Sequence, residues 1–88
     1  MTSQVVTIIN PLGLHARAAA RFVSLAGRFN SQISVTRGSR TMDGKSILGL
    51  LLLAAARGAQ VAIVADGPDE TAAVAALVSL AERGFEDA

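Results

Sequence analysis

The chain has 88 residues, with 8 Lys and Arg against 7 Asp and Glu, and a formal net charge of +1. This length allows one small domain, residues 1–88, and the charge balance gives no electrostatic indication of nucleic-acid binding. Because there is no cysteine and only one histidine, a disulfide framework is excluded and a zinc site is hard to assemble. We therefore expect neither a metal nor a cofactor.

The longest apolar stretch, residues 47–56, is about half as long as the roughly 20 residues that a membrane-spanning helix needs. The first nine residues, MTSQVVTII, lack the basic region and the long apolar core of a secretory signal. We expect a cytoplasmic protein that does not insert into a membrane, and the absence of cysteine suits a reducing compartment.

Hydrophobic periodicity predicts the secondary structure in chain order. Short β-branched or alternating runs predict strands over residues 5–9, 32–37, 40–42 and 60–65. Helical spacing of apolar residues predicts helices over residues 16–28, from Ser46 to about residue 57, and from Asp69 to Arg83, with a frayed tail after Gly84. The order βαββαβα predicts an α+β fold, an open-faced β-sandwich in which a four-stranded antiparallel sheet carries three helices on one face.

The only histidine, His15, stands in the loop NPLGLHAR at residues 10–17, directly before the first predicted helix. The unpaired N–H groups and the dipole at a helix N-terminus attract an anion such as phosphate. The same positive end disfavours imidazolium and leaves a neutral ring nitrogen as a nucleophile. A histidine placed in this way can accept a phosphoryl group, and the alternative is a loop residue or helix cap without chemistry.

Arg17 lies two residues further on, in the first turn of that helix. Its planar fork of donors suits the oxygens of a transferring phosphoryl group. As a purely structural residue it would oppose the helix dipole, and a bound anion removes that conflict. Arg21, Ser24 and Arg28 continue one helical stripe from Arg17, which predicts either a face for an acidic partner or a solubilising surface.

The sequence GKSILGLLLLAAA, at residues 44–56, carries more apolar side chains than the core of one small domain can cover. We assign Leu50 and Leu53 to the core. Ile47, Leu48 and Leu51 are assigned to an exposed docking surface.

Ser46 begins this second helix, and its hydroxyl is expected to serve as the N-cap. A phosphate on Ser46 would place negative charge beside the docking surface and repel an acidic partner. The residue thus has a structural interpretation and a regulatory one.

Two motifs, GLHARAAARFV at residues 13–23 and GKSILGLLLLAA at residues 44–55, together with a GPDE turn before the last helix, resemble the HPr family. HPr is the histidine phosphocarrier of the bacterial phosphoenolpyruvate-dependent phosphotransferase system, and the resemblance covers essentially the whole chain. It implies that Enzyme I phosphorylates His15 on Nδ1, that the group passes to a IIA protein or domain, and that Arg17 assists. It also implies a stoichiometric carrier and not an enzyme, acting as a monomer. The partner surface that we expect includes Ala16, Arg21, Ile47, Leu48 and Leu51.

The resemblance also concerns regulation. The chain differs from the usual family sequence at some positions. Ser46 matches the serine that is modified in relatives from organisms with an HPr kinase/phosphorylase. Ala18 stands where the family usually has proline, and Ser24 and Gly27 stand where sugar-pathway carriers often have lysine. The nitrogen-related branch, NPr, shares the same architecture, so the branch, the IIA partner and any transported sugar stay open.

Two other classes of function compete with this interpretation. A ferredoxin-like domain that senses a small molecule has the same βαββαβ order and would make His15 incidental. An RNA-binding sheet needs stacking aromatic residues, and this chain has three Phe and no Trp or Tyr. Phosphate acceptance on His15 distinguishes a phosphocarrier from both.

Overall fold

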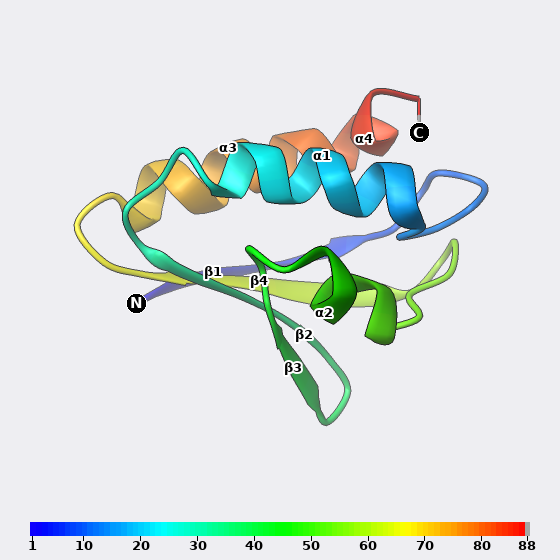
Figure 1. Ribbon diagram of the computed structural model, residues 1–88, viewed down its shortest axis with the longest axis horizontal. Coiled ribbons are helices and arrows are strands. Elements are labelled where there is room, and N and C mark those ends of the chain that lie inside the picture. The colour runs from blue at the N-terminus through cyan, green and yellow to red at the C-terminus, as the bar shows by residue number, and fades with distance from the viewer. Residues whose placement is uncertain (88) are drawn as a thin grey trace.

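The computed structural model describes residues 1–87, and its centre is one antiparallel sheet (Figure 1). The strands are β1 (Thr2–Thr7), β2 (Gln32–Arg37), β3 (Arg40–Asp43) and β4 (Gln60–Asp66), in the spatial order β1-β4-β2-β3. The register places Thr2 opposite Ala65 in the β1–β4 pair and Ile33 opposite Ala65 in the β2–β4 pair. The first and the last strand of the sequence are therefore neighbours in the sheet.

Four helical segments accompany the sheet: α1 (Ala16–Ala26), α2 (Ile47–Leu52), α3 (Glu70–Glu82) and α4 (Gly84–Asp87). In Figure 1, α1 and α3 lie side by side over one face of the sheet. The short helix α2 contacts α1 and the edge strand β3. The four-stranded antiparallel sheet with helices packed against it confirms the predicted open-faced α+β sandwich.

The core lies between the sheet and the helices. Alternation along β2 and β4 turns Ile33, Val35, Val61 and Ile63 inward, where they are almost completely buried. The helices cover them with apolar side chains that include Ala19 and Phe22 of α1, Leu50 of α2 and Leu77 of α3. Each helix thus contributes its apolar face to one continuous core.

Strand β1 starts three residues earlier than the sequence predicts and ends at Thr7 rather than Ile9. The polar residues Thr2 and Ser3 give no periodic signal, but pairing with β4 satisfies their backbone groups. Beyond the strand, Ile8 still exchanges backbone hydrogen bonds with the loop before β4, donating to Ala59 O at 2.9 Å and accepting from Gly58 N at 2.7 Å.

The second helix ends at Leu52, so the prediction that it continues to about residue 57 is wrong. Leu53 and Ala54 close it with bonds to the carbonyl three residues earlier, and Ala54 has a φ of 51°. The chain then buries Ala55, whose carbonyl oxygen accepts the N–H of Leu14 at 2.8 Å. This tertiary contact outweighs the high helix propensity of the alanine run.

Residues 84–86 form a defined turn, so the expectation of a frayed tail is wrong for them, whereas Ala88 lies outside the described residues. Gly84, Phe85 and Glu86 form a left-handed turn with φ values of 62°, 55° and 56°. The Phe85 side chain is 1% exposed and belongs to the core. Burial of this aromatic ring compensates for the unfavourable backbone conformation.

Candidate functional site

His15 is the N-cap of α1. Its backbone is extended (φ −84°, ψ −176°), and its ring nitrogen Nδ1 accepts the backbone N–H of Arg17 at 3.3 Å. Its carbonyl oxygen accepts the first regular helical bond, from Ala19 N at 2.8 Å. An imidazole nitrogen thus occupies the position where a serine or aspartate oxygen usually caps a helix.

The two nitrogens of the His15 ring have different surroundings. The Nδ1 bond to Arg17 lies at the exposed end of the helix, whereas Nε2 is buried and has no hydrogen-bond partner among the described residues. An atom that accepts an N–H must carry a lone pair, so a neutral ring has its proton on Nε2. This arrangement leaves Nδ1 as the nucleophilic nitrogen at the surface.

The loop before His15 is built around Gly13, which has a φ of 67°. A side chain at this position would bring its Cβ to 2.5 Å from the carbonyl oxygen of Ala55. The carbonyl oxygen of Gly13 accepts two bonds, from Asn10 Nδ2 at 2.6 Å and from His15 N at 2.9 Å. The tight turn therefore fixes the backbone of His15 before α1 begins.

The arginines of α1 and of the segment after it differ in their exposure and in their hydrogen bonds. Arg17 is exposed beside His15, and Ala16 is exposed next to it. Arg21 is half-buried and donates from Nη1 to the carbonyl oxygens of Phe85 at 2.7 Å and Glu86 at 2.6 Å. Its charge thus stabilises the left-handed turn, a role that the sequence does not indicate. Arg28 lies in the segment after the helix and is exposed.

Ala18 is completely buried against the core. The backbone N–H of a residue at this position is one of the orphan donors of a helix N-terminus. A proline would lose no hydrogen bond there, and the alanine keeps the donor that proline lacks.

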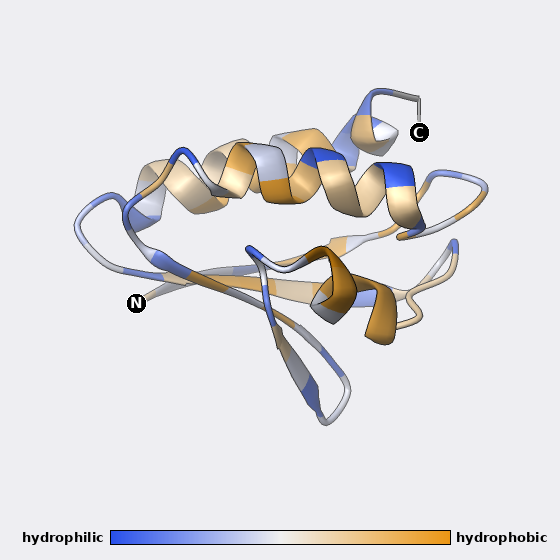
Figure 2. Cartoon of the chain, in the orientation of Figure 1, coloured by the Kyte–Doolittle hydropathy of each residue, from blue (hydrophilic) through white to orange (hydrophobic). Residues whose placement is uncertain are grey.

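An apolar patch lies on α2. We define it as Ile47, Leu48, Leu51 and Leu52, whose exposed fractions run from 37% for Leu51 to 66% for Leu48. In Figure 2 most of α2 has the colour of hydrophobic residues, and the helix contacts α1. Leu50 and Leu53 are fully buried, so the predicted division of this helix into core and exposed residues is confirmed. The sequence reasoning missed Leu52, and also Leu12, which is 72% exposed in the loop before His15.

Ser46 caps α2, as the sequence predicts. Its Oγ accepts the backbone N–H of Gly49 at 3.1 Å, and its own backbone N–H donates to Asp43 O at 3.2 Å. The residue directly precedes the apolar patch. Any charge added to Ser46 would therefore adjoin Ile47 and Leu48.

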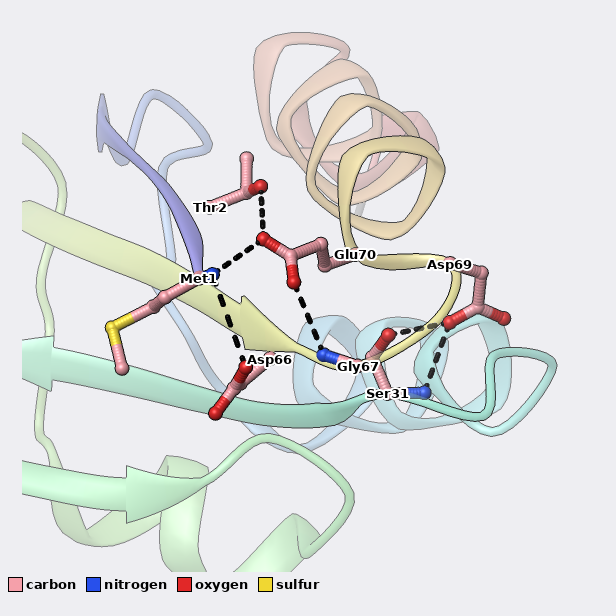
Figure 3. A network of polar contacts seen from close by, with 7 residues as sticks. All are labelled: Met1, Thr2, Ser31, Asp66, Gly67, Asp69 and Glu70. Carbon is pink, nitrogen blue, oxygen red and sulfur yellow. Dashed lines mark hydrogen bonds and ion pairs between the residues drawn. The ribbon is translucent and has the colours of Figure 1, made fainter.

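A polar network joins the start of β1 to the start of α3, at the opposite end of the sheet from His15 (Figure 3). Glu70 accepts from the N-terminal ammonium of Met1 at 2.7 Å, from Thr2 Oγ1 at 2.6 Å and from Gly67 N at 3.3 Å. The ammonium group and then the Thr2 hydroxyl and the Gly67 N–H lower the pKa of Glu70 to about 2. These contacts favour the ionised carboxylate and tie β1 to α3.

Asp69 forms a second part of this network. Its carboxylate accepts the hydroxyl of Ser31 and the backbone N–H groups of Asn30 and Ser31, the latter two at 2.8 and 2.9 Å. The Ser31 hydroxyl, followed by the Asn30 N–H, lowers the pKa of Asp69 below its usual range. The network fastens the loop before β2 and serves the fold rather than the His15 site.

Among the side chains that the structure describes, there is no group of three or more His, Cys, Asp or Glu residues arranged to hold a metal ion. No helix of residues 1–87 has the length and apolar character needed to cross a membrane.

A family model described as the PTS HPr component phosphorylation site matches residues 2–83. Phosphocarrier protein HPr of Cupriavidus necator is 51% identical over 79 residues, which cover 90% of this chain and 89% of the relative. Phosphocarrier protein NPr of Shewanella violacea is 39% identical over 83 residues, covering 94% and 91%. The chain is thus similar to relatives that carry either branch name.

Solved structures of HPr proteins also match this chain in sequence and in fold. The crystal structure of HPr-C-His from Thermoanaerobacter tengcongensis has a TM-score of 0.95 at 41% identity, covering 100% of this chain and 99% of the other. A crystal structure of an HPr dimer from the same organism has a TM-score of 0.77 at 42% identity, covering 97% and 98%. The fold is shared over the full described length.

Proposed function

The chain belongs to the HPr family of phosphotransferase-system phosphocarriers, and from this we propose that it accepts a phosphoryl group from phosphorylated Enzyme I on His15 and passes it to a IIA protein or domain. The observation that carries the proposal is the orientation of the His15 ring, with Nδ1 at the exposed N-terminus of α1 and Nε2 buried. The protein is then a stoichiometric carrier and not an enzyme, and residues 1–88 act as one phosphocarrier domain.

In the first transfer, the lone pair of Nδ1 attacks the phosphorus atom. The Nδ1–P bond forms while the bond between phosphorus and the leaving atom of the donor breaks, and that electron pair stays with the donor. The lone pair of Nδ1 no longer accepts the Arg17 N–H, which becomes available to a phosphoryl oxygen. The anion thus replaces the imidazole as the cap of α1, at the end of the helix that favours negative charge.

Arg17 stabilises the transferring group. Its guanidinium is exposed in the first turn of α1, adjacent to the accepting nitrogen. Charge-assisted bonds from guanidinium to phosphoryl oxygens strengthen as charge spreads over those oxygens in the transition state. In the second transfer the same contacts hold the group while a nucleophile of the IIA protein attacks phosphorus and the Nδ1–P bond breaks.

The apolar patch is proposed as the surface that docks both Enzyme I and the IIA partner, together with Ala16 and Arg21. Helix α2 contacts α1, so the patch lies on the same side of the molecule as the helix that begins at His15. Several exposed leucine and isoleucine side chains gathered on one short helix are typical of a protein interaction site. A partner seated on the patch would also exclude water from the transferring group.

Ser46 is proposed as a regulatory position where the cell contains an HPr kinase/phosphorylase. A phosphate there would adjoin the patch and repel acidic residues of a docking partner. Because Ser46 Oγ already caps α2, the added charge would also favour the helix end.

The ligand-sensing alternative lacks an enclosed cavity among the residues that the structure describes, because its two larger hollows, of about 480 Å³ beside Ser31 and Asp66 and about 390 Å³ beside Arg21 and Arg83, are open surface clefts. The space enclosed by core residues such as Val6, Phe22 and Leu50 measures about 10 Å³. A small-molecule site usually measures about 300 Å³ or more. The phosphocarrier is accordingly the preferred function, acting as a monomer in the cytoplasm, in either the sugar or the nitrogen-related branch.

The test is ³¹P NMR after incubation with phosphoenolpyruvate and purified cognate Enzyme I. We expect a phosphohistidine signal from the wild type and none from His15→Gln. No signal from the wild type with an Enzyme I that is demonstrably active would overturn the proposal. Transfer from the loaded protein to candidate IIA proteins of each branch would then identify the partner.

A further inference from the structure

Two buried side-chain atoms in residues 1–87 have no hydrogen-bond partner: Asn10 Oδ1 and His15 Nε2. Buried polar atoms in native proteins are nearly always paired, so two exceptions in one six-residue loop require an explanation. They are chemically complementary. An amide oxygen only accepts, and the Nε2 of a neutral imidazole whose Nδ1 accepts an N–H is a donor.

A hydrogen bond from its Nδ2 group fixes the orientation of the Asn10 side-chain amide. Asn10 Nδ2 donates to Gly13 O at 2.6 Å, which identifies that atom as the nitrogen and the unpaired atom as the oxygen. The side chain is only 4% exposed, and its Cβ lies 3.7 Å from the position that a Cβ on Gly84 would occupy. Asn10 is therefore held between the loop and the left-handed turn.

Asn10 and His15 are also brought together by one shared atom. The carbonyl oxygen of Gly13 accepts both Asn10 Nδ2 and the backbone N–H of His15. In addition, Gly13 N donates to Asn10 O at 3.0 Å, which closes the turn from the other side. The amide group and the backbone of His15 thus lie within two hydrogen-bond lengths of each other.

We propose that Asn10 is a positioning residue for phosphoryl transfer, and that its Oδ1 accepts the Nε2–H of His15 directly or through one buried water. This proposal deepens the proposed function but does not need it, because the proposed hydrogen bond belongs to the unphosphorylated protein. Together with the Arg17 N–H on Nδ1, it fixes the proton on Nε2 and the lone pair on Nδ1.

The same bond assists the reaction. When the Nδ1–P bond forms, the proton stays on Nε2 and the ring becomes cationic. An amide oxygen bonded to Nε2–H stabilises this charge, because hydrogen bonds with an ionised partner are stronger than neutral ones. Asn10 therefore acts through His15 and makes no contact with the phosphoryl group.

The experiment follows the Nε2–H proton by NMR in ¹⁵N-labelled protein at alkaline pH, without Enzyme I or phosphoenolpyruvate. Asn10→Ala removes the acceptor, and we expect the solvent exchange of Nε2–H to accelerate about tenfold, the effect of losing one net hydrogen bond. Asn10→Asp keeps acceptor oxygens but loses the N–H donor to Gly13 O. We expect the solvent exchange of His15 Nε2–H to remain slow in this variant. Asn30→Ala replaces an exposed asparagine of another loop and is the control.

Two results would overturn the proposal. Equal exchange in wild type and Asn10→Ala would show that Oδ1 does not hold the proton. Fast exchange in both Asn10→Ala and Asn10→Asp would assign the effect to the Nδ2 bond and to loop structure. A failed ³¹P experiment leaves these readouts intact, so the failure of the phosphocarrier function and the failure of this proposal are distinguishable.

Discussion

Leu14 donates its backbone N–H to the carbonyl oxygen of Ala55 at 2.8 Å, and this bond joins the loop before α1 to the segment after α2. The two segments that carry His15 and the apolar patch are therefore fastened to each other by backbone atoms. The contact depends on close approach at Gly13.

Gly13→Ala should break this approach. Its Cβ would lie 2.5 Å from Ala55 O and 2.9 Å from Ala56 Cα, so the backbone must move, at a cost of about 1–3 kcal/mol beyond the strain of a positive φ. Gly38→Ala is the matched control, because Gly38 has a similar φ of 60° and open space around a Cβ. Chemical denaturation measures both, and equal losses of unfolding free energy would contradict the clash.

Leu48→Ala should weaken docking without affecting the fold. Leu48 is the most exposed residue of the apolar patch, and truncating an interface anchor costs about 1–2 kcal/mol, or about tenfold in affinity. We expect Enzyme I to show a higher KM for this variant as its substrate, with little change in kcat. Val5→Ala, on the helix-free face of the sheet, is the control, and an equal rise in KM for that variant would argue against the patch.

Ser46 has two separable roles. Ser46→Ala removes the N-cap of α2 and should lower the unfolding free energy by about 1 kcal/mol, while Ser39→Ala in the exposed hairpin turn should not. Ser46→Asp keeps a capping oxygen and adds charge, so it should retain stability and weaken the binding of Enzyme I, measured by calorimetry. Full-strength binding of Ser46→Asp would count against the regulatory role.

Glu70 should govern stability in acid. Its pKa is lowered from 4.5 to about 2, so its contribution is complete above pH 4.5 and is lost as the pH falls towards 2. In Glu70→Gln, Tm should be lower at neutral pH and should change less steeply between pH 4.5 and 2. Glu82→Gln, at the exposed end of α3, is the control, and parallel Tm profiles for wild type and Glu70→Gln would refute the assignment.

Phe85→Ala should destabilise the protein by about 3–5 kcal/mol, because it empties a fully buried aromatic position. Leu12→Ala, which truncates an exposed side chain, should have an effect near zero. Differential scanning calorimetry measures both. A small loss in Phe85→Ala would mean that the left-handed turn contributes little to the core.

The sequence was sufficient to predict those features of the structure that depend on the residues of a single helix or strand. Alternation predicted β2 with the observed bounds, apolar spacing predicted the start of α1 at Ala16, and the Ser46 cap predicted the start of α2. The choice of Leu50 and Leu53 as core residues also held, because helical periodicity reports burial directly. These features are local.

The features that the sequence could not predict depend on contacts between distant residues. Helix α2 stops early because Ala55 meets Leu14, and Phe85 orders the tail because α1 supplies Arg21 to bind the turn. At the site, the position of His15 was predictable, but the division of its ring into an exposed Nδ1 and a buried Nε2 was not. The buried Asn10 amide gave no sequence signal, since asparagine before proline is typical of an ordinary turn.

The pairing of β1 with β4 also constrains the order of events during synthesis. Thr2 is synthesised before β2 and β3, but its ladder partner Ala65 follows only after both of these strands have been made. The nascent chain therefore holds an unpaired strand while residues 8–59 are made, and the core is incomplete until Phe85 has been added. Such non-local contacts make folding slower than in helical bundles of the same size. The fold that presents His15 therefore forms only when residues 1–85 have all been synthesised, as one late event.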